Sequence, residues 1–185
     1  MTTLSPSAPT GAPAADLIDR LAGLAPGSPV HALRHRREKV VAATQGSHDG
    51  LFDPALPGLS LAERLLVAVY ACRLTPAPGL AAHYRARLTE LGVAPALVAV
   101  VDVGDPQQLD DERLRAMLTF TRTLILKPIE GDQAALRTLP EAGIDTPSTV
   151  TLAQLIAFIS YQTRLVAGLA ALAAASAGAT SESAR

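Results

Sequence analysis

Three observations predict an all-α protein, a multi-helix bundle of about eight helices. Apolar residues recur three and four positions apart along most of the chain, which places them on one face of a helix. Several of these segments begin with a Ser, Asp or Pro that can start a helix and end at Gly or Pro. Apolar residues make up 49% of the chain but aromatic residues only 3%, so an aliphatic core of Ala, Leu, Val and Ile is expected, which favours helices.

The chain of 185 residues is expected to form a single helical domain over residues 15–175. Residues 1–14 and 176–185 are rich in small and polar residues and show no periodicity, which predicts a disordered tail at each end. No tandem repeat of fixed period is found. One hydrophobic core is therefore expected.

The first two helices are predicted from spacing and capping. Leucines recur at helical spacing over residues 16–24, where a short helix is expected to end at the glycine or proline that follows. Ser28 before Pro29 has the pattern of an N-cap followed by proline at the first helical position. The second helix is expected to run from there to about Gly46.

The next two helices flank a proline-rich connection. Ser60 and Glu63 have the spacing of a capping box, so a helix is expected over residues 61–74. A Pro-Ala-Pro sequence interrupts this helix, because proline can neither donate the backbone hydrogen bond nor fit the helix interior. A further helix is expected over residues 79–91.

The following three segments are also expected to be helical. Residues 95–101 fit a short helix or a short strand, and we prefer the helix. Asp110 or Asp111 is expected to cap a helix over residues 112–126. A short helix is expected over residues 132–142.

The last helix is predicted to be the longest. It is expected to begin at Thr149 or Thr151 and is apolar on nearly every face. Its length fits a membrane span, but Gln154, Gln162 and Arg164 fall within it and much of its apolar content is alanine. We therefore expect a helix buried in the bundle or in a subunit interface, and no membrane partner.

The net charge and the N-terminal sequence limit which partners and which cellular location are expected. The net charge is -1, from 16 Lys and Arg against 17 Asp and Glu, which argues against a general nucleic-acid surface. The basic run at residues 34–39 is interrupted by Glu38 and contains no aromatic residue, so it is interpreted as a solvated helix face. No nucleic-acid partner is expected. The first residues lack the pattern of a signal peptide, which predicts a cytoplasmic location.

Cysteine and histidine content limits redox and metal chemistry. The single cysteine, Cys72, excludes an internal disulfide, a CxxC pair and a multi-cysteine zinc site, and it is expected to be a buried structural thiol. His31 and His35 are four residues apart, which could place both on one helix face. Because no carboxylate or cysteine completes this set locally, no metal and no cofactor are expected.

Two parts of the sequence resemble a known family. The segment LSLAERLLVAV at residues 59–69, followed by an interruption and Ala-Ala-His at residues 81–83, resembles the core of the carboxymuconolactone decarboxylase and alkylhydroperoxidase D superfamily. Residues 109–121 and 156–165 resemble the second half of its peroxidase-related, antioxidant members. The resemblance implies an alkylhydroperoxidase D-like helical fold and assembly into a homo-oligomer.

The resemblance also implies a degenerate active site. In alkylhydroperoxidases of this superfamily the redox site holds a CxxC pair and a histidine four residues after its second cysteine, and an upstream glutamate completes a proton relay. The cysteine positions here hold Pro76 and Gly79, the histidine is His83, and the glutamate falls on or beside Arg64, with Glu63 as an approximate substitute. Neither proline nor glycine can attack a peroxide or resolve a sulfenic acid.

Several functions stay open at this point. The chain could be a binding or partner subunit without thiol peroxidase activity, taking a small-molecule ligand or a CxxC-containing paralogue. The alternative is a cysteine-free decarboxylase or isomerase with His83 as acid or base and Arg73 or Arg164 holding a substrate carboxylate. A residual one-cysteine peroxidase through Cys72 is a further alternative. Tyr161, Gln162 and Arg164 are polar groups in apolar surroundings, so they would line a small-molecule pocket or hold a subunit interface.

Overall fold

The computed structural model describes residues 16–103 and 105–182, and the regular elements in these ranges are all helices. They confirm the predicted all-α class and the prediction of about eight helices. In chain order they are α1 (Leu17–Leu21), α2 (Pro29–His35), α3 (Glu38–Leu51), α4 (Leu61–Leu74), α5 (Pro78–Glu90), α6 (Pro95–Val103), the 3-10 turn η1 (Pro106–Gln108), α7 (Glu112–Leu126), the 3-10 turn η2 (Pro128–Glu130), α8 (Gln133–Glu141) and α9 (Thr146–Glu182).

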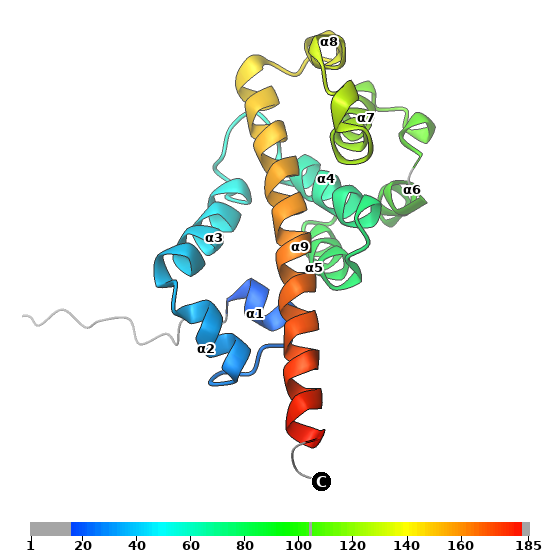
Figure 1. The fold of residues 1–185 in the computed structure, drawn as a ribbon. Coiled ribbons are helices and arrows are strands. Elements are labelled where there is room, and N and C mark those ends of the chain that lie inside the picture. Colours follow the sequence, from blue (N-terminus) through cyan, green and yellow to red (C-terminus); the bar gives the residue numbers. More distant parts are fainter. Residues whose placement is uncertain (1–15, 104, 183–185) are drawn as a thin grey trace, which may run out of the picture.

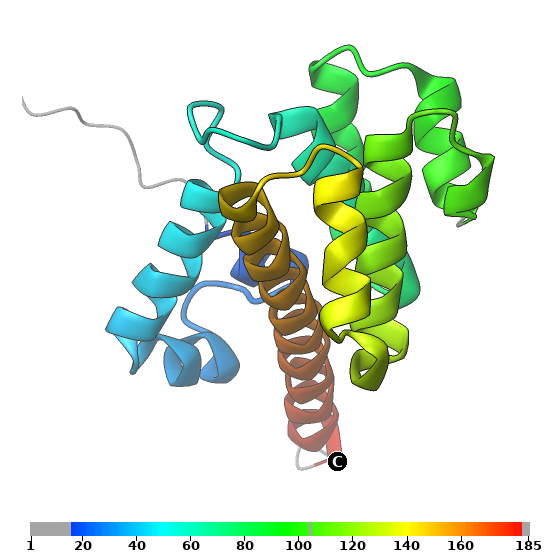
Figure 2. The ribbon, with the colours of Figure 1, turned by 90° about the horizontal axis from the view of Figure 1, so that it is seen from above.

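The helices are arranged on two sides of α9. Figures 1 and 2 show α1, α2 and α3 on one side of this helix and α4 to α8 on the other. The C-terminal part of α9 extends past the rest of the molecule (Figure 1). The first three helices therefore meet the remainder of the protein mainly through α9, while α1 and α3 also contact α5.

The core is centred on α4. Every residue from Leu65 to Cys72 is at most 2% exposed, so this helix is buried on all sides. It packs against α5, α6, α7 and α9. Its start is set by the predicted capping box: the Ser60 side chain accepts from the Glu63 N–H, and Glu63 accepts from the Ser60 N–H. Burial of each large aliphatic side chain contributes about 1.5–3 kcal/mol, so α4 carries much of the driving force for folding.

One predicted helix is divided in two. The sequence analysis expected a single helix over residues 29–46, whereas α2 ends at His35 and α3 begins at Glu38. The physical reason lies on either side of the break: Arg34 and His35 bind Asp19 of α1, while α3 packs along α9. Because α2 is held against α1 and α3 against α9, the chain turns between these two helices.

Helix α9 starts earlier and ends later than expected. The Asp145 carboxylate accepts a hydrogen bond from the Ser148 N–H (2.9 Å), so the helix begins at Thr146 and not at Thr149 or Thr151. It continues through residues 176–182, which were assigned to a C-terminal tail. The expected N-terminal tail, residues 1–14, lies outside the described residues.

Helix α9 is also the element that decides whether the chain could cross a membrane. Residues 146–178 are long and apolar enough to cross a membrane, but the core helices of soluble proteins meet the same criteria of length and composition. Only 28% of the most apolar stretch is buried within the chain. The absence of a membrane partner stays a prediction.

Candidate functional site

The proline-rich turn between α4 and α5 holds the chain's only cysteine beneath it. Pro78 occupies the first turn of α5, and the Ala77 N–H donates to the Cys72 carbonyl (3.0 Å). The Cys72 thiol is 1% exposed, and burial raises its pKa to about 12. This confirms the prediction of a buried thiol. A surface hollow of about 460 Å³ beside the turn is lined by Arg73, Arg85 and Asp102 among others.

Glu63 is engaged away from His83. Its Oε2 accepts from the Ser60 N–H (2.6 Å), and its Oε1 accepts from the Arg113 guanidinium (2.7 Å). These contacts join the N-terminus of α4 to α7. Because both oxygens already bind other partners, the structure supports a structural role for Glu63 instead of the proposed proton relay.

Arg64, at the position that the resemblance assigns to the relay glutamate, is a structural residue. Its side chain is completely buried. The guanidinium donates to the carbonyls of Leu59 (3.1 Å), Leu51 (2.5 Å) and Asp53 (3.0 Å). Burial lowers its pKa from an ordinary value of 12.5, and a guanidinium remains charged at neutral pH. Arg64 thus fixes the segment between α3 and α4.

His83 lies on α5 with its ring turned towards α1 and α3. The Arg20 guanidinium of α1 is 3.4 Å from its Nδ1, and the His48 ring of α3 lies 6.1 Å away between centroids. Because arginine can only donate, Nδ1 accepts and the proton of the neutral ring is assigned to Nε2. Burial, followed by the charges of His48, Arg20 and Arg87, lowers the pKa of His83 to about 4. His83 is therefore neutral at physiological pH.

His48 is assigned the tautomer opposite to that of His83. Its Nδ1 is 3.1 Å from Oδ1 of Asp49, and a carboxylate only accepts, so the proton is assigned to Nδ1. Burial lowers the pKa of His48, and the hydrogen bond to Asp49 partly opposes this effect. The Nε2 atom of the neutral ring then carries a lone pair. An adjacent carboxylate that orients a histidine in this way is the arrangement that makes imidazole a general base.

These two histidines hold an unusual pair of atoms. Among the described residues, the buried side-chain nitrogens and oxygens without a hydrogen-bond partner are Nε2 of His48 and Nε2 of His83. Leaving a buried polar group unpaired costs about 1–3 kcal/mol, so such atoms usually mark a water or ligand position. By the assigned tautomers, one of the two atoms is a donor and the other is an acceptor.

Aromatic and cationic side chains surround the histidine pair. The Arg87 guanidinium lies over the Phe52 ring, 5.2 Å from its centroid, and Phe52 contacts Tyr84 with centroids 5.0 Å apart. The Tyr84 hydroxyl donates to Oε1 of Gln162 (2.5 Å) and so joins α5 to α9. We call His48, His83, Arg20, Arg87 and Asp49 the histidine-pair site.

The structure distributes the other predicted site residues elsewhere. Arg73 is exposed beside the Cys72 turn. The Tyr161 hydroxyl is 3.2 Å from Oγ1 of Thr44, and Arg164 is exposed and donates to the Ser160 carbonyl (2.7 Å). Only His83 belongs to the histidine-pair site. Two local signals were present, because Arg87 follows His83 by one helical turn on α5 and Asp49 follows His48 on α3. The site was missed because nothing in the sequence joined these two pairs to each other or to Arg20 of α1.

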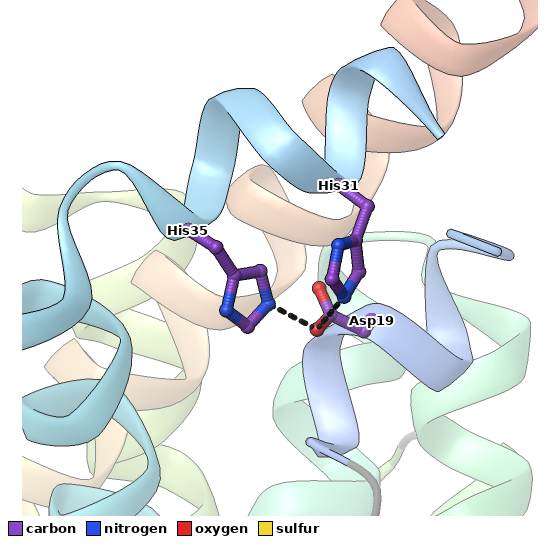
Figure 3. Close-up of side chains that lie close together, drawn as sticks. All are labelled: Asp19, His31 and His35. Carbon is purple, nitrogen blue, oxygen red and sulfur yellow. Dashed lines mark hydrogen bonds and ion pairs between the residues drawn. The ribbon is translucent and has the colours of Figure 1, made fainter. Parts of the chain in front are cut away.

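A second polar cluster lies where α1 meets α2. Figure 3 shows Asp19 of α1 facing His31 and His35 of α2. No metal was expected from the sequence, because no carboxylate or cysteine completed this set locally. The structure supplies one, because the loop after α1 returns the chain alongside it.

Comparison with protein-family models and with curated proteins found no match for this chain. The resemblance to the carboxymuconolactone decarboxylase and alkylhydroperoxidase D superfamily therefore stays a prediction. It depends on the motifs at residues 59–69, 81–83, 109–121 and 156–165.

Proposed function

We propose that this chain is an alkylhydroperoxidase D-like protein without thiol peroxidase activity, which binds a small organic acid at the histidine-pair site. The observation that carries the proposal is the pair of buried Nε2 atoms that lack a partner, on His48 and His83. A carboxylate can accept the proton of His83 Nε2, and the charges of Arg20 and Arg87 favour an anion.

The tautomers narrow the class of ligand. The lone pair of His48 Nε2 requires a donor, which a carboxylate cannot supply but a hydroxyl group can. A hydroxy acid satisfies both histidines, with its hydroxyl on His48 and its carboxylate on His83. Such an acid should bind more tightly than the same acid without the hydroxyl, because the latter leaves His48 unpaired.

Malate and succinate form a matched pair of probes for this site. We expect malate to shift the imidazole 15N resonances of His48 and His83 and to bind about tenfold more tightly than succinate, which corresponds to one lost hydrogen bond. His48→Phe, which keeps a ring but has no acceptor, should remove this preference, whereas Arg122→Gln, an exposed change on α7, should not. Absence of any shift at millimolar malate would refute the proposed site.

A catalytic role at the same site is the second candidate, and the Asp49–His48 pair favours it. A histidine oriented by a carboxylate can hold and return a proton. In a lactone decarboxylation the bond to the carboxylate carbon breaks, carbon dioxide leaves, and the enolate that remains takes a proton from an acid. The test is carbon dioxide release from carboxymuconolactone, retained in Cys72→Ser and lost in His48→Gln and in His83→Gln. Equal release in all variants would exclude this role.

We further propose that the protein is a homo-oligomer that associates through a surface formed by α2, α3 and α9. Four large apolar side chains are exposed there or further along α9: Leu33, Val40, Tyr161 and Leu172. Exposed apolar patches of this kind commonly mark protein interfaces. Light scattering should give a mass above that of one 19.1 kDa chain, and a Leu33→Asp/Val40→Asp variant should shift it to the monomer. A monomeric wild type would contradict this.

A further inference from the structure

The side chains of Asp19, His31 and His35 bring three potential metal-ligand atoms close together. Nε2 of His35 is 2.7 Å from Oδ2 of Asp19, and Nε2 of His31 is 3.7 Å from the same oxygen. The two imidazole rings are stacked, with centroids 4.1 Å apart and an interplanar angle of 20°. Figure 3 shows both rings directed from α2 towards the carboxylate on α1.

We propose that Asp19, His31 and His35 form a binding site for a divalent transition-metal ion, with Zn²⁺ as the best match. Two imidazole nitrogens and one carboxylate oxygen are a ligand set that Zn²⁺ accepts, and three protein ligands leave one position for water. The three ligand atoms already lie within 4.8 Å of one another. Tetrahedral ligands of zinc are about 3.3 Å apart, so small side-chain rotations complete the site.

A hydrogen-bonded clamp between α1 and α2 explains only part of this arrangement. One histidine is enough to donate to Oδ2, and His35 does so at 2.7 Å. His31 at 3.7 Å is beyond hydrogen-bond distance but presents the same nitrogen to the same oxygen. Two histidines one helical turn apart that converge on one carboxylate are what a chelate requires.

Arg34 orients the Asp19 carboxylate but leaves one of its oxygens available to a metal. Its Nη1 donates to Oδ1 of Asp19 (2.7 Å) and lies 3.0 Å from Oδ1 of Asp16. Oδ2 of Asp19 therefore remains free of the guanidinium, while the carboxylate orientation is held as in the outer ligand shell of metal sites. The carboxylates of Asp16 and Asp19 and the guanidinium of Arg34 together carry a charge of -1. This negative charge lies beside the two histidines and favours a bound cation.

Zinc titration against a chromophoric indicator tests this site. Metal-stripped wild type should bind one Zn²⁺ per chain, and His31→Gln and His35→Gln should each weaken binding by about 10–100-fold. Glutamine can still donate to Asp19, so both variants should keep their helical circular dichroism. Co²⁺ in place of Zn²⁺ should give the visible absorption bands of a tetrahedral N/O site, and Zn²⁺ should raise the Tm of the wild type more than that of His31→Gln or of His35→Gln.

The other two histidines of the chain provide the matched control. His48→Gln/His83→Gln removes the same number of imidazoles and should leave zinc binding unchanged. The proposal is overturned if wild type binds no more zinc than His31→Gln/His35→Gln does. It is equally overturned if binding is lost in the His48→Gln/His83→Gln control instead, which would move the metal to the histidine-pair site.

Discussion

Replacement of Arg64 by leucine is expected to lower the free energy of unfolding by about 3–5 kcal/mol. The buried guanidinium donates to the carbonyls of Leu51, Asp53 and Leu59, and leucine leaves all three without this donor. The segment between α3 and α4 then loses its attachment to the core. Urea unfolding followed by circular dichroism measures this change.

Two further variants define the cause of that loss. Arg122→Leu, on the exposed surface of α7, should change the free energy of unfolding by less than about 0.5 kcal/mol. Arg64→Lys keeps the charge but cannot reach three carbonyls at once, so its stability should fall between wild type and Arg64→Leu. If Arg64→Leu unfolds within about 1 kcal/mol of wild type, water replaces the guanidinium and our interpretation of this residue is wrong.

Cys72 is expected to react with a disulfide reagent about 1000-fold more slowly in the folded protein than in the denatured chain. Burial raises the pKa of its thiol from 9.0 to about 12, which is three powers of ten in the thiolate fraction at neutral pH. Its 1% exposure slows access of the reagent further. The measurement is labelling by an aromatic disulfide with and without denaturant.

An exposed cysteine on the same protein supplies the reference rate. Ala86→Cys in a Cys72→Ser background places a thiol on the exposed face of α5, and it should react at the rate of an ordinary surface thiol.

Hydroperoxide consumption with a dithiol reductant should be absent in wild type. Consumption that disappears in Cys72→Ser would show that one-cysteine peroxidase chemistry persists and would contradict the proposed function.

The position of Arg64 bears on the predicted degenerate site. A proton relay needs a group that gains and loses a proton near neutral pH, and a guanidinium does not. In this chain that position stabilises the fold, and Glu63 beside it joins α4 to α7. The structure brings His48 and Asp49 to His83 instead, so the acid–base groups near His83 come from α3 and not from α4.

The sequence by itself determined the class of the fold and most helix boundaries. The capping box at Ser60 predicted the start of α4, and a cap at Asp110 or Asp111 predicted the start of α7, where the structure uses Asp111. Both predictions succeed because caps act on backbone groups within one turn. The Pro-Ala-Pro sequence predicted the turn at Pro76. The general tendency of free cysteines to be buried predicted a buried Cys72. Local signals were wrong where packing overrode them: the chain breaks after His35, and α3 continues past Gly46 to Leu51.

Only the tertiary structure decided the candidate sites. His48 and His83 are 35 residues apart in the sequence, and Asp19 lies 12 residues before His31, so neither grouping leaves a local pattern. They form because α3 and α5 bring the His48 and His83 rings together beside Arg20 of α1, and because the short loop after α1 places α2 beside it. Local backbone preferences act over a few residues, whereas the convergence of side chains depends on how whole helices bury their apolar faces against each other.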